Sequence, residues 1–319
     1  MILSDVHYAC AAERARTNYE VAGINRPLVK LMLRFWRRYL WLADPFAHNY
    51  LLDRFLEKCG AADLVVANGD YSCDSAFIGV SDAPSRESAM ECLGKLRARF
   101  GEKLRAVMGD HELGKSSLAG NAGGLRLESF RVATEQLKIE PAWEQRVGRH
   151  VLIGVTSTLI AFDVYQRDAL PEELAQWKRL RDEHFEKVRE MFAKVDAGDR
   201  IILFCHDPTA LPFLAADRVI EKKVSQIERT IIGHLHTDLV FWNTRWLAGC
   251  PPIRLFGKGV FRISCGLNRA RGWRPFRPLL CPSLAGSQLL KDGGYYSLRI
   301  SDAGADFTRH RLKWEKQTR

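Results

Sequence analysis

The chain has 319 residues, of which 46% are hydrophobic and 27% are charged, so it can bury a sizeable core and has a globular composition. No uncharged apolar run approaches the ~20 residues that a membrane-spanning helix needs, which argues against an integral membrane protein. The 48 Lys and Arg residues outnumber the 38 Asp and Glu residues. The resulting charge of +10 favours phosphorylated substrates, nucleic acid or an anionic membrane surface, without selecting among them.

Short apolar segments alternate with amphipathic ones, which predicts a layered α/β fold. Strands are expected at 1–3, 64–67, 104–108, 151–155, 201–204, 230–232, 260–264, 295–300 and 306–312. Helices are expected at 45–59, 85–99 and 171–194. The eight cysteines form no CxxC pair, and this pattern predicts a reduced, cytoplasmic compartment.

Motifs rich in Asp and His follow five of the expected strands. They are Ser-Asp-Val-His at 4–7, Asn-Gly-Asp at 68–70, Gly-Asp-His-Glu at 109–112, Cys-His-Asp-Pro at 205–208 and Gly-His-Leu-His at 233–236. Ligands of open α/β sheets bind at the carboxyl ends of the strands. We therefore expect these side chains to meet at one rim.

Carboxylates mixed with imidazoles are suitable ligands for a pair of divalent ions. Two ions roughly 3.5–4 Å apart acidify a bridging water to hydroxide and clamp a phosphoryl group, which is how phosphate esters are hydrolysed at neutral pH. Asp5 and His7 are two residues apart, as are His234 and His236, so each pair faces one side of an extended segment. Taken singly, each residue is also explained by a turn or a surface position. The five motifs together favour a metal site.

The series of motifs resembles the calcineurin-like metallophosphoesterase family from residue 1 to about residue 268. The resemblance implies a four-layered α/β/β/α sandwich, which we expect to form a single domain over residues 1–319. It also implies two divalent metal ions, with Mn²⁺ as the first choice and Fe or Zn²⁺ as alternatives. By the same resemblance, Asp70 would bridge the ions, one of which would be held by Asp5, His7 and His236 and the other by Asp110, His206 and His234. His111 would protonate the leaving oxygen or hold the phosphate.

Asp110 departs from the family, which normally has Asn at this position. A third carboxylate lowers the formal charge of a site with two divalent ions from +2 to +1. One extra charge about 4 Å from the phosphate costs up to ~4 kcal/mol at an effective dielectric of 20. We therefore expect slower turnover than in an Asp110→Asn variant, or a preference for a less charged diester.

Residues 11–44 exceed what the first crossover needs and are expected to form an insertion, here called the lid. On a helix over 26–42, one side carries Lys30, Arg34, Arg37 and Arg38, and the other is largely apolar. One interpretation packs the apolar side on the domain and leaves the basic side in water. Others place the helix at an anionic membrane, over an acyl chain, or on nucleic acid.

A second basic and aromatic stretch begins at residue 262, and prolines at 275 and 278 predict an irregular loop. Residues 269–319 are expected to form a basic C-terminal loop and a strand pair packed on the same domain. These stretches, the lid and the segment after Asp110 supply the candidate substrate-binding residues Arg34, Arg38, Arg126 and Arg269.

Three functions remain open from the sequence. The first is a phosphodiesterase or phosphatase acting on nucleotides or other small esters in the cytoplasm. The second is a peripheral membrane hydrolase of lipid-linked phosphoesters or pyrophosphates, similar in setting to the UDP-diacylglucosamine pyrophosphatases, which carry Arg where this chain has His111. The third is a metal-binding scaffold without catalysis. Nucleic acid is a lower-ranked partner.

Overall fold

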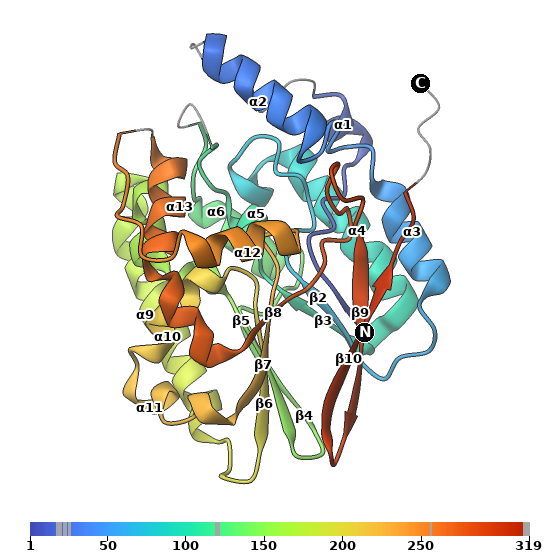
Figure 1. Cartoon of the computed structure of the whole chain (residues 1–319), viewed down its shortest axis with the longest axis vertical. Coiled ribbons are helices and arrows are strands. Elements are labelled where there is room, and N and C mark those ends of the chain that lie inside the picture. Colours follow the sequence, from blue (N-terminus) through green and yellow to red (C-terminus); the bar gives the residue numbers. More distant parts are fainter. Residues whose placement is uncertain (17–20, 22–23, 25–26, 119–121, 256, 315–319) are drawn as a thin grey trace.

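Two five-stranded sheets face each other in the computed structural model, which describes residues 1–16, 21, 24, 27–118, 122–255 and 257–314 (Figure 1). The first sheet has the order β10-β9-β1-β2-β3, with β1 (Ile2–Leu3), β2 (Val65–Asn68), β3 (Leu104–Val107), β9 (Gly294–Ser301) and β10 (Gly304–Arg311). The second has the order β4-β5-β6-β7-β8, with β4 (Ala142–Val147), β5 (His150–Val155), β6 (Arg200–Cys205), β7 (Ile227–Ile232) and β8 (Pro278–Leu280).

The central strands of both sheets are parallel. β1 pairs with β2 and β2 with β3, while β5 to β8 pair in sequence in the second sheet. β4 and the hairpin β9–β10 add antiparallel strands, and β9 joins β1 through the pair Ile2 and Tyr296. The strand that begins the chain therefore lies between β2 and a strand from the far end of the chain.

Alternation of side chains along β2 explains the layers. Val66 points between the sheets, where it belongs to one apolar cluster with Ile202 and Phe204 of β6. Val65 and Ala67 point the other way and join the larger apolar cluster that includes the helices outside the first sheet. The predicted four-layered α/β/β/α sandwich is confirmed.

Helices cover the outer faces of both sheets (Figure 1). The longer ones are α3 (Asn49–Lys58), α4 (Ala83–Phe100), α6 (Leu127–Glu135) and α9 (Leu174–Ala193). Shorter ones are α5 (Asp110–Leu113), α7 (Ser157–Ile160), α8 (Phe162–Tyr165), α10 (Leu211–Ala215) and α11 (Arg218–Glu221). The lid contains α1 (Ala11–Arg14) and α2 (Pro27–Tyr39), and the segment after β7 contains α12 (Asp238–Trp246) and α13 (Lys258–Arg269).

The strand expected at 260–264 was wrong, because these residues lie within α13. The buried positions Gly259, Arg262 and Gly266 recur every three or four residues, which is the helical period. A short apolar run does not by itself distinguish a strand from a helix segment.

The irregular loop expected around Pro275 and Pro278 was also wrong. A 3-10 helix spans Ala270–Phe276, and Pro278 opens β8. β8 is the edge strand of its sheet, where a missing N–H group is tolerated. The other strand that the sequence did not reveal, β4, is also an edge strand.

The lid helix does not bury its apolar side. No residue of α2 is buried. The exposed residues include Leu28, Leu31, Met32, Phe35 and Tyr39, and 61% of the surface of Phe35 is accessible. The interpretation in which the apolar side packs on the domain is wrong for these five residues. Arg26, the first residue of the expected helix, lies outside the described residues.

Candidate metal centre

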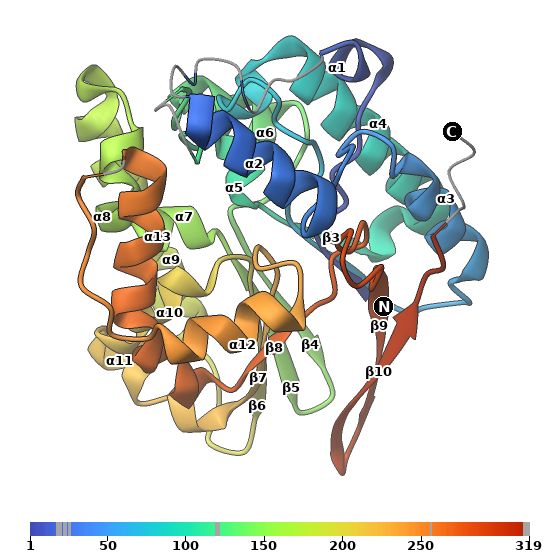
Figure 2. The same ribbon diagram turned by 45° about the horizontal axis from the view of Figure 1, so that its top comes forward.

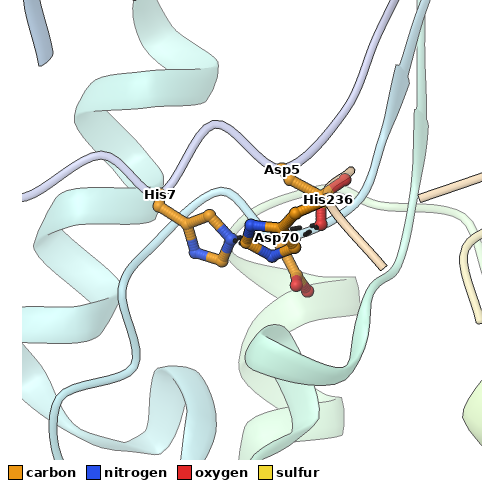
Figure 3. A group of neighbouring side chains, drawn as sticks. All are labelled: Asp5, His7, Asp70 and His236. Carbon is orange, nitrogen blue, oxygen red and sulfur yellow. Dashed lines mark hydrogen bonds and ion pairs between the residues drawn. The ribbon is translucent and has the colours of Figure 1, made fainter. Parts of the chain in front are cut away.

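Five strand ends bring the predicted ligands to one rim. Asp5 follows β1, Asp70 follows β2, Asp110 begins α5 after β3, His206 follows β6, and His234 and His236 follow β7. Their ligand atoms form two groups, each with members within 4.8 Å of one another. One group is Asp5, His7, Asp70 and His236, drawn in Figure 3, and the other is Asp70, Asp110, His206 and His234. Asp70 belongs to both groups.

Most of these residues have an unusual backbone. Asp5, His7, Asp70, His234 and His236 all have φ between 48° and 59°, the left-handed region that residues other than glycine seldom adopt. Such conformations cluster at functional sites, where the surrounding structure holds them. Here the amide of Asp5 donates to the carbonyl of Gly69 at 3.1 Å, and the amide of His7 donates to the carbonyl of Asp70 at 3.0 Å.

The glycines in the motifs lie where a larger side chain would not fit. A Cβ atom on Gly69 would lie 2.6 Å from Nδ1 of His206, and one on Gly233 would lie 2.6 Å from Oδ2 of Asp5. The Gly-Asp and Gly-His patterns therefore reflect the close approach of the chain to the neighbouring candidate ligands.

Imidazole nitrogens converge in the first group. Nε2 of His7 and Nε2 of His236 are 3.1 Å apart, and Oδ1 of Asp5 is 3.3 Å from Nε2 of His236. Two neutral imidazoles and a carboxylate that point at one place form a suitable donor set for a divalent transition metal.

The second group contains buried polar atoms without a hydrogen-bond partner among the described residues. Nε2 of His206 and Oδ2 of Asp70 are 3.1 Å apart, and neither forms a hydrogen bond. Nδ1 of His234 is 3.0 Å from Oδ1 of Asp110. Buried polar atoms are nearly always paired, so this arrangement fits a divalent ion bound between them.

Hydrogen bonds from behind orient the candidate ligands. Nδ1 of His206 donates to the carbonyl of Asn68 at 2.5 Å, which leaves Nε2 free to bind a metal. The Ser4 hydroxyl donates to Oδ2 of Asp5 at 2.5 Å, and the amide of His234 donates to its Oδ1 at 3.0 Å.

Glu112 holds the backbone beneath the shared ligand. Its carboxylate accepts hydrogen bonds from the amides of Asp70 (3.0 Å), Tyr71 (2.8 Å) and Gly109 (2.8 Å). Burial, with the nearby Asp70 carboxylate, raises the pKa of Glu112 to about 7. The sequence analysis gave this residue no role, although it lies in the Gly-Asp-His-Glu motif.

Burial and the neighbouring carboxylates shift the pKa values of Asp5 and His206 in the centre. Burial raises the pKa of Asp5 above its ordinary value. Burial opposes the charged form of His206, but the carboxylates of Asp70 and Asp5 outweigh it and raise the pKa of His206 well above its ordinary value. Carboxylates that stabilise the cationic form of a buried imidazole also favour the binding of a metal cation.

Lys115 offsets the charge of Asp110, because its ammonium group pairs with Oδ2 of that carboxylate. Three carboxylates, one ammonium group and two divalent ions sum formally to −3 + 1 + 4 = +2. This sum is the charge that the sequence analysis assigned to a site with Asn in place of Asp110. Lys115 lies five residues beyond Asp110, in the segment that the sequence analysis treated only as a source of substrate contacts.

A cavity of about 440 Å³ opens onto the centre. His111 lines it, with its Nε2 atom 3.7 Å from Oδ2 of Asp70, and burial lowers the pKa of His111 to about 3. The cations among the described lining residues are Arg37, Lys115 and Arg262. Arg262 was expected in an irregular stretch, but it is buried in α13 and pairs with Asp168.

The four candidate substrate-binding arginines lie elsewhere. Arg34, Arg38, Arg126 and Arg269 are absent from the cavity lining. Arg38 lies over the ring of Tyr39 and Arg269 over that of Phe213, at 5.6 and 5.0 Å from the ring centres.

A known protein family matches the chain, whereas comparison with curated proteins gives no match. The matching family model is that of the calcineurin-like phosphoesterases, and it covers residues 1–238. This range contains every candidate metal ligand, from Asp5 to His236, and ends before α13. The chain belongs to the calcineurin-like phosphoesterase family.

Proposed function

We propose that this protein is a binuclear metal-dependent phosphoesterase that hydrolyses a phosphate ester. Family membership supports metal-dependent hydrolysis of phosphoesters. The observation that carries the binuclear assignment is the pair of ligand groups that share Asp70. A carboxylate common to two groups is the arrangement that a bridging ligand requires.

The residues present fit two divalent ions, for which Mn²⁺ is our first choice and Fe or Zn²⁺ are alternatives. Asp5, His7 and His236 would hold one ion, and Asp110, His206 and His234 the other, with Asp70 between them. Such ions would acidify a water molecule and neutralise charge on the phosphoryl oxygens. His111, beside Asp70 at the cavity wall, would hydrogen-bond to the phosphoryl group or to the leaving oxygen.

Hydrolysis of bis-p-nitrophenyl phosphate and p-nitrophenyl phosphate, with and without Mn²⁺, tests this assignment. We expect Mn²⁺-dependent cleavage by the wild type and a loss of at least 100-fold in Asp70→Ala, with less bound Mn²⁺ by elemental analysis. Asp302→Ala is the matched control, because Asp302 is exposed in the turn between β9 and β10. Equal activity in Asp70→Ala and the wild type would contradict the proposal.

A scaffold without catalysis gives a different result. It would bind Mn²⁺ in an Asp70-dependent way and would cleave neither ester. The ratio of diester to monoester cleavage separates a phosphodiesterase from a phosphatase.

No helix in the described part of the chain combines the length and the apolar character needed to cross a membrane. The lipid-linked alternative therefore concerns a substrate reached from the membrane surface. The cavity next to the centre favours this alternative.

A further inference from the structure

The cavity at the candidate metal centre is mainly apolar on the sides away from the metal ligands. Its floor includes His7, His111, His234 and His236. Its walls come from three helices that lie on the side of the molecule facing the reader in Figure 2, namely α2, α12 and α13. The apolar wall residues include Leu33 and Trp36 of α2, Val240 of α12 and Leu267 of α13.

The size and lining of this cavity point to an apolar ligand group. A volume of about 440 Å³ lies in the range of small-molecule sites, which are mostly apolar with a few polar groups that fix orientation. Here the polar groups include the metal ligands, where a phosphoryl group would be held, together with Arg37, Asn243 and Arg262 on the helical walls. The rest of the cavity offers mainly aliphatic and aromatic surface to whatever is attached to that phosphoryl group.

Exposed apolar residues continue from the cavity onto the surface of the same helices. We call Leu28, Leu31, Met32, Phe35, Trp242 and Trp246 the apolar rim. Trp246 has 75% of its surface accessible, and its ring packs only loosely against Trp242, with centroids 5.6 Å apart. Contiguous exposed apolar patches on a protein mark interaction surfaces, and tryptophan is enriched at the interface between lipid and water.

Positive charges predominate around the apolar rim. Arg34, Arg38, Arg245 and Arg254 are exposed there, and residues 27–42 and 239–255 contain no Asp or Glu. The exposed carboxylate at the start of α12, Asp238, is paired with Arg309. The rim of a protein–protein interface is polar and accessible to solvent. An apolar surface flanked mainly by cations complements an anionic bilayer.

We propose that the apolar rim docks on an anionic bilayer and that the cavity binds the aliphatic chain of a phosphoester drawn from it. This inference rests on the proposed phosphoesterase function and names its substrate class. The lid helix α2 has two roles in this arrangement. Its inner residues Leu33 and Trp36 contact the chain, while its outer residues enter the bilayer.

Two p-nitrophenyl phosphodiesters with the same leaving group, one a methyl ester and the other a dodecyl ester, test the cavity. Each buried methylene group contributes a factor of about four to binding. We expect kcat/KM to be at least ten-fold higher for the dodecyl ester, measured below its micellar concentration. Filling the cavity with Leu33→Trp or Val240→Trp should reduce the ratio of kcat/KM for the dodecyl ester to kcat/KM for the methyl ester at least five-fold. α2 contains no buried residue, so Leu33→Trp does not disturb the core.

Binding without catalysis separates failure of this inference from failure of the proposed function. Dodecyl phosphate should change the fluorescence of the cavity tryptophans in a saturable way in Asp70→Ala, while methyl phosphate should not. A wild type that cleaves both esters with equal kcat/KM would overturn the cavity assignment and leave the phosphoesterase function intact. Saturable dodecyl phosphate binding by an enzyme that cleaves no ester would support the cavity and contradict the function.

Co-sedimentation with vesicles tests the apolar rim. We expect the wild type to sediment with phosphatidylglycerol vesicles at least five-fold more than with phosphatidylcholine vesicles. The double variant Leu31→Glu with Phe35→Glu should abolish sedimentation with phosphatidylglycerol vesicles. Met90→Glu is the control and should sediment like the wild type, because Met90 is comparably exposed but lies on α4, outside the apolar rim. A dimer in solution that the same α2 variant disrupts, with no vesicle binding, would assign the apolar rim to a second copy and overturn the bilayer proposal.

Discussion

The indole ring of Trp41 lies against the imidazole of His236, with ring centroids 4.5 Å apart and an angle of 37° between the planes. Trp36 of α2 stacks on Trp41, with ring centroids 5.0 Å apart and nearly parallel planes. A continuous aromatic contact thus connects the lid helix with a candidate metal ligand. The position of α2 and the orientation of the His236 ring are therefore linked.

Removing this contact should weaken metal binding. In Trp41→Ala the His236 ring loses the surface that fixes its orientation, and outer-sphere partners of this kind contribute 10–100-fold to metal affinity. We expect the Mn²⁺ dissociation constant, measured by titration calorimetry, to rise about ten-fold. Trp41→Phe should recover most of the loss. Equal Mn²⁺ affinity in all three proteins would show that the contact is incidental.

Lys115 should be needed for activity because of Asp110. In Lys115→Met the Asp110 carboxylate loses its cation, and the phosphate meets an additional negative charge nearby. We expect kcat/KM for bis-p-nitrophenyl phosphate to fall at least ten-fold, or about 1.4 kcal/mol in transition-state stabilisation.

The double variant isolates this pair. Adding Asp110→Asn to Lys115→Met should recover most of the lost activity, since neither charge is then present. The sequence alone predicted that Asp110→Asn speeds turnover. Because Lys115 already offsets the carboxylate, we expect Asp110→Asn by itself to change kcat by less than about ten-fold. Additive effects of the two substitutions would contradict the coupling.

Glu112 should stabilise the fold at the centre. The two carboxylate oxygens of Glu112 accept three backbone hydrogen bonds, and Glu112→Gln replaces one of these oxygens with an amide donor. An unsatisfied buried donor costs about 1–3 kcal/mol. Urea unfolding of the metal-free protein should show a loss of this size. Glu57→Gln, at an exposed position of α3, is the control and should unfold with the wild type.

His184 should make the protein sensitive to acid. Burial lowers the pKa of His184 from the ordinary 6.5 to about 4, so its neutral form is the one compatible with the folded state. Its contribution is present above pH 6.5 and is lost as the pH falls towards 4, because the unfolded chain binds the proton more tightly. The loss reaches about 3 kcal/mol well below pH 4.

His184→Gln removes this titration and tests its sign. The amide of Thr156 donates to Nε2 of His184 at 3.2 Å, and the glutamine oxygen can accept the same bond. The variant should therefore lose less stability than the wild type between pH 6.5 and pH 4 in urea unfolding. Parallel pH profiles for the two proteins would assign the acid sensitivity to other groups.

The strand ends were predictable because an apolar run followed directly by Asp or His indicates a strand and a candidate ligand in the same short segment. Asp5 and His206 are 201 residues apart, yet both directly follow buried strands whose carboxyl ends meet. Residues that act through tertiary contacts were not predictable in this way. Lys115 and Glu112 depend on the path of the chain after Asp110, and that path has no periodic signature.

The lid shows a second limit. Its amphipathic pattern predicted a helix correctly, and α2 occupies most of the expected range. The pattern could not show which side faces the domain, because apolar residues spread over more than half of the helix surface. The structure directs Leu33 and Trp36 inward and leaves Phe35 outward.

The pairing of β1 with β9 has a consequence for the order of synthesis. A ribosome-bound chain that ends near residue 238 already contains every candidate ligand, but β1, which precedes Asp5, still lacks its neighbour on one side. The hydroxyl of Ser283, which donates to the backbone carbonyl of Asp5 at 3.1 Å, is also missing at that stage. Nascent protein therefore acquires its complete set of ligands well before it acquires the segment that secures them.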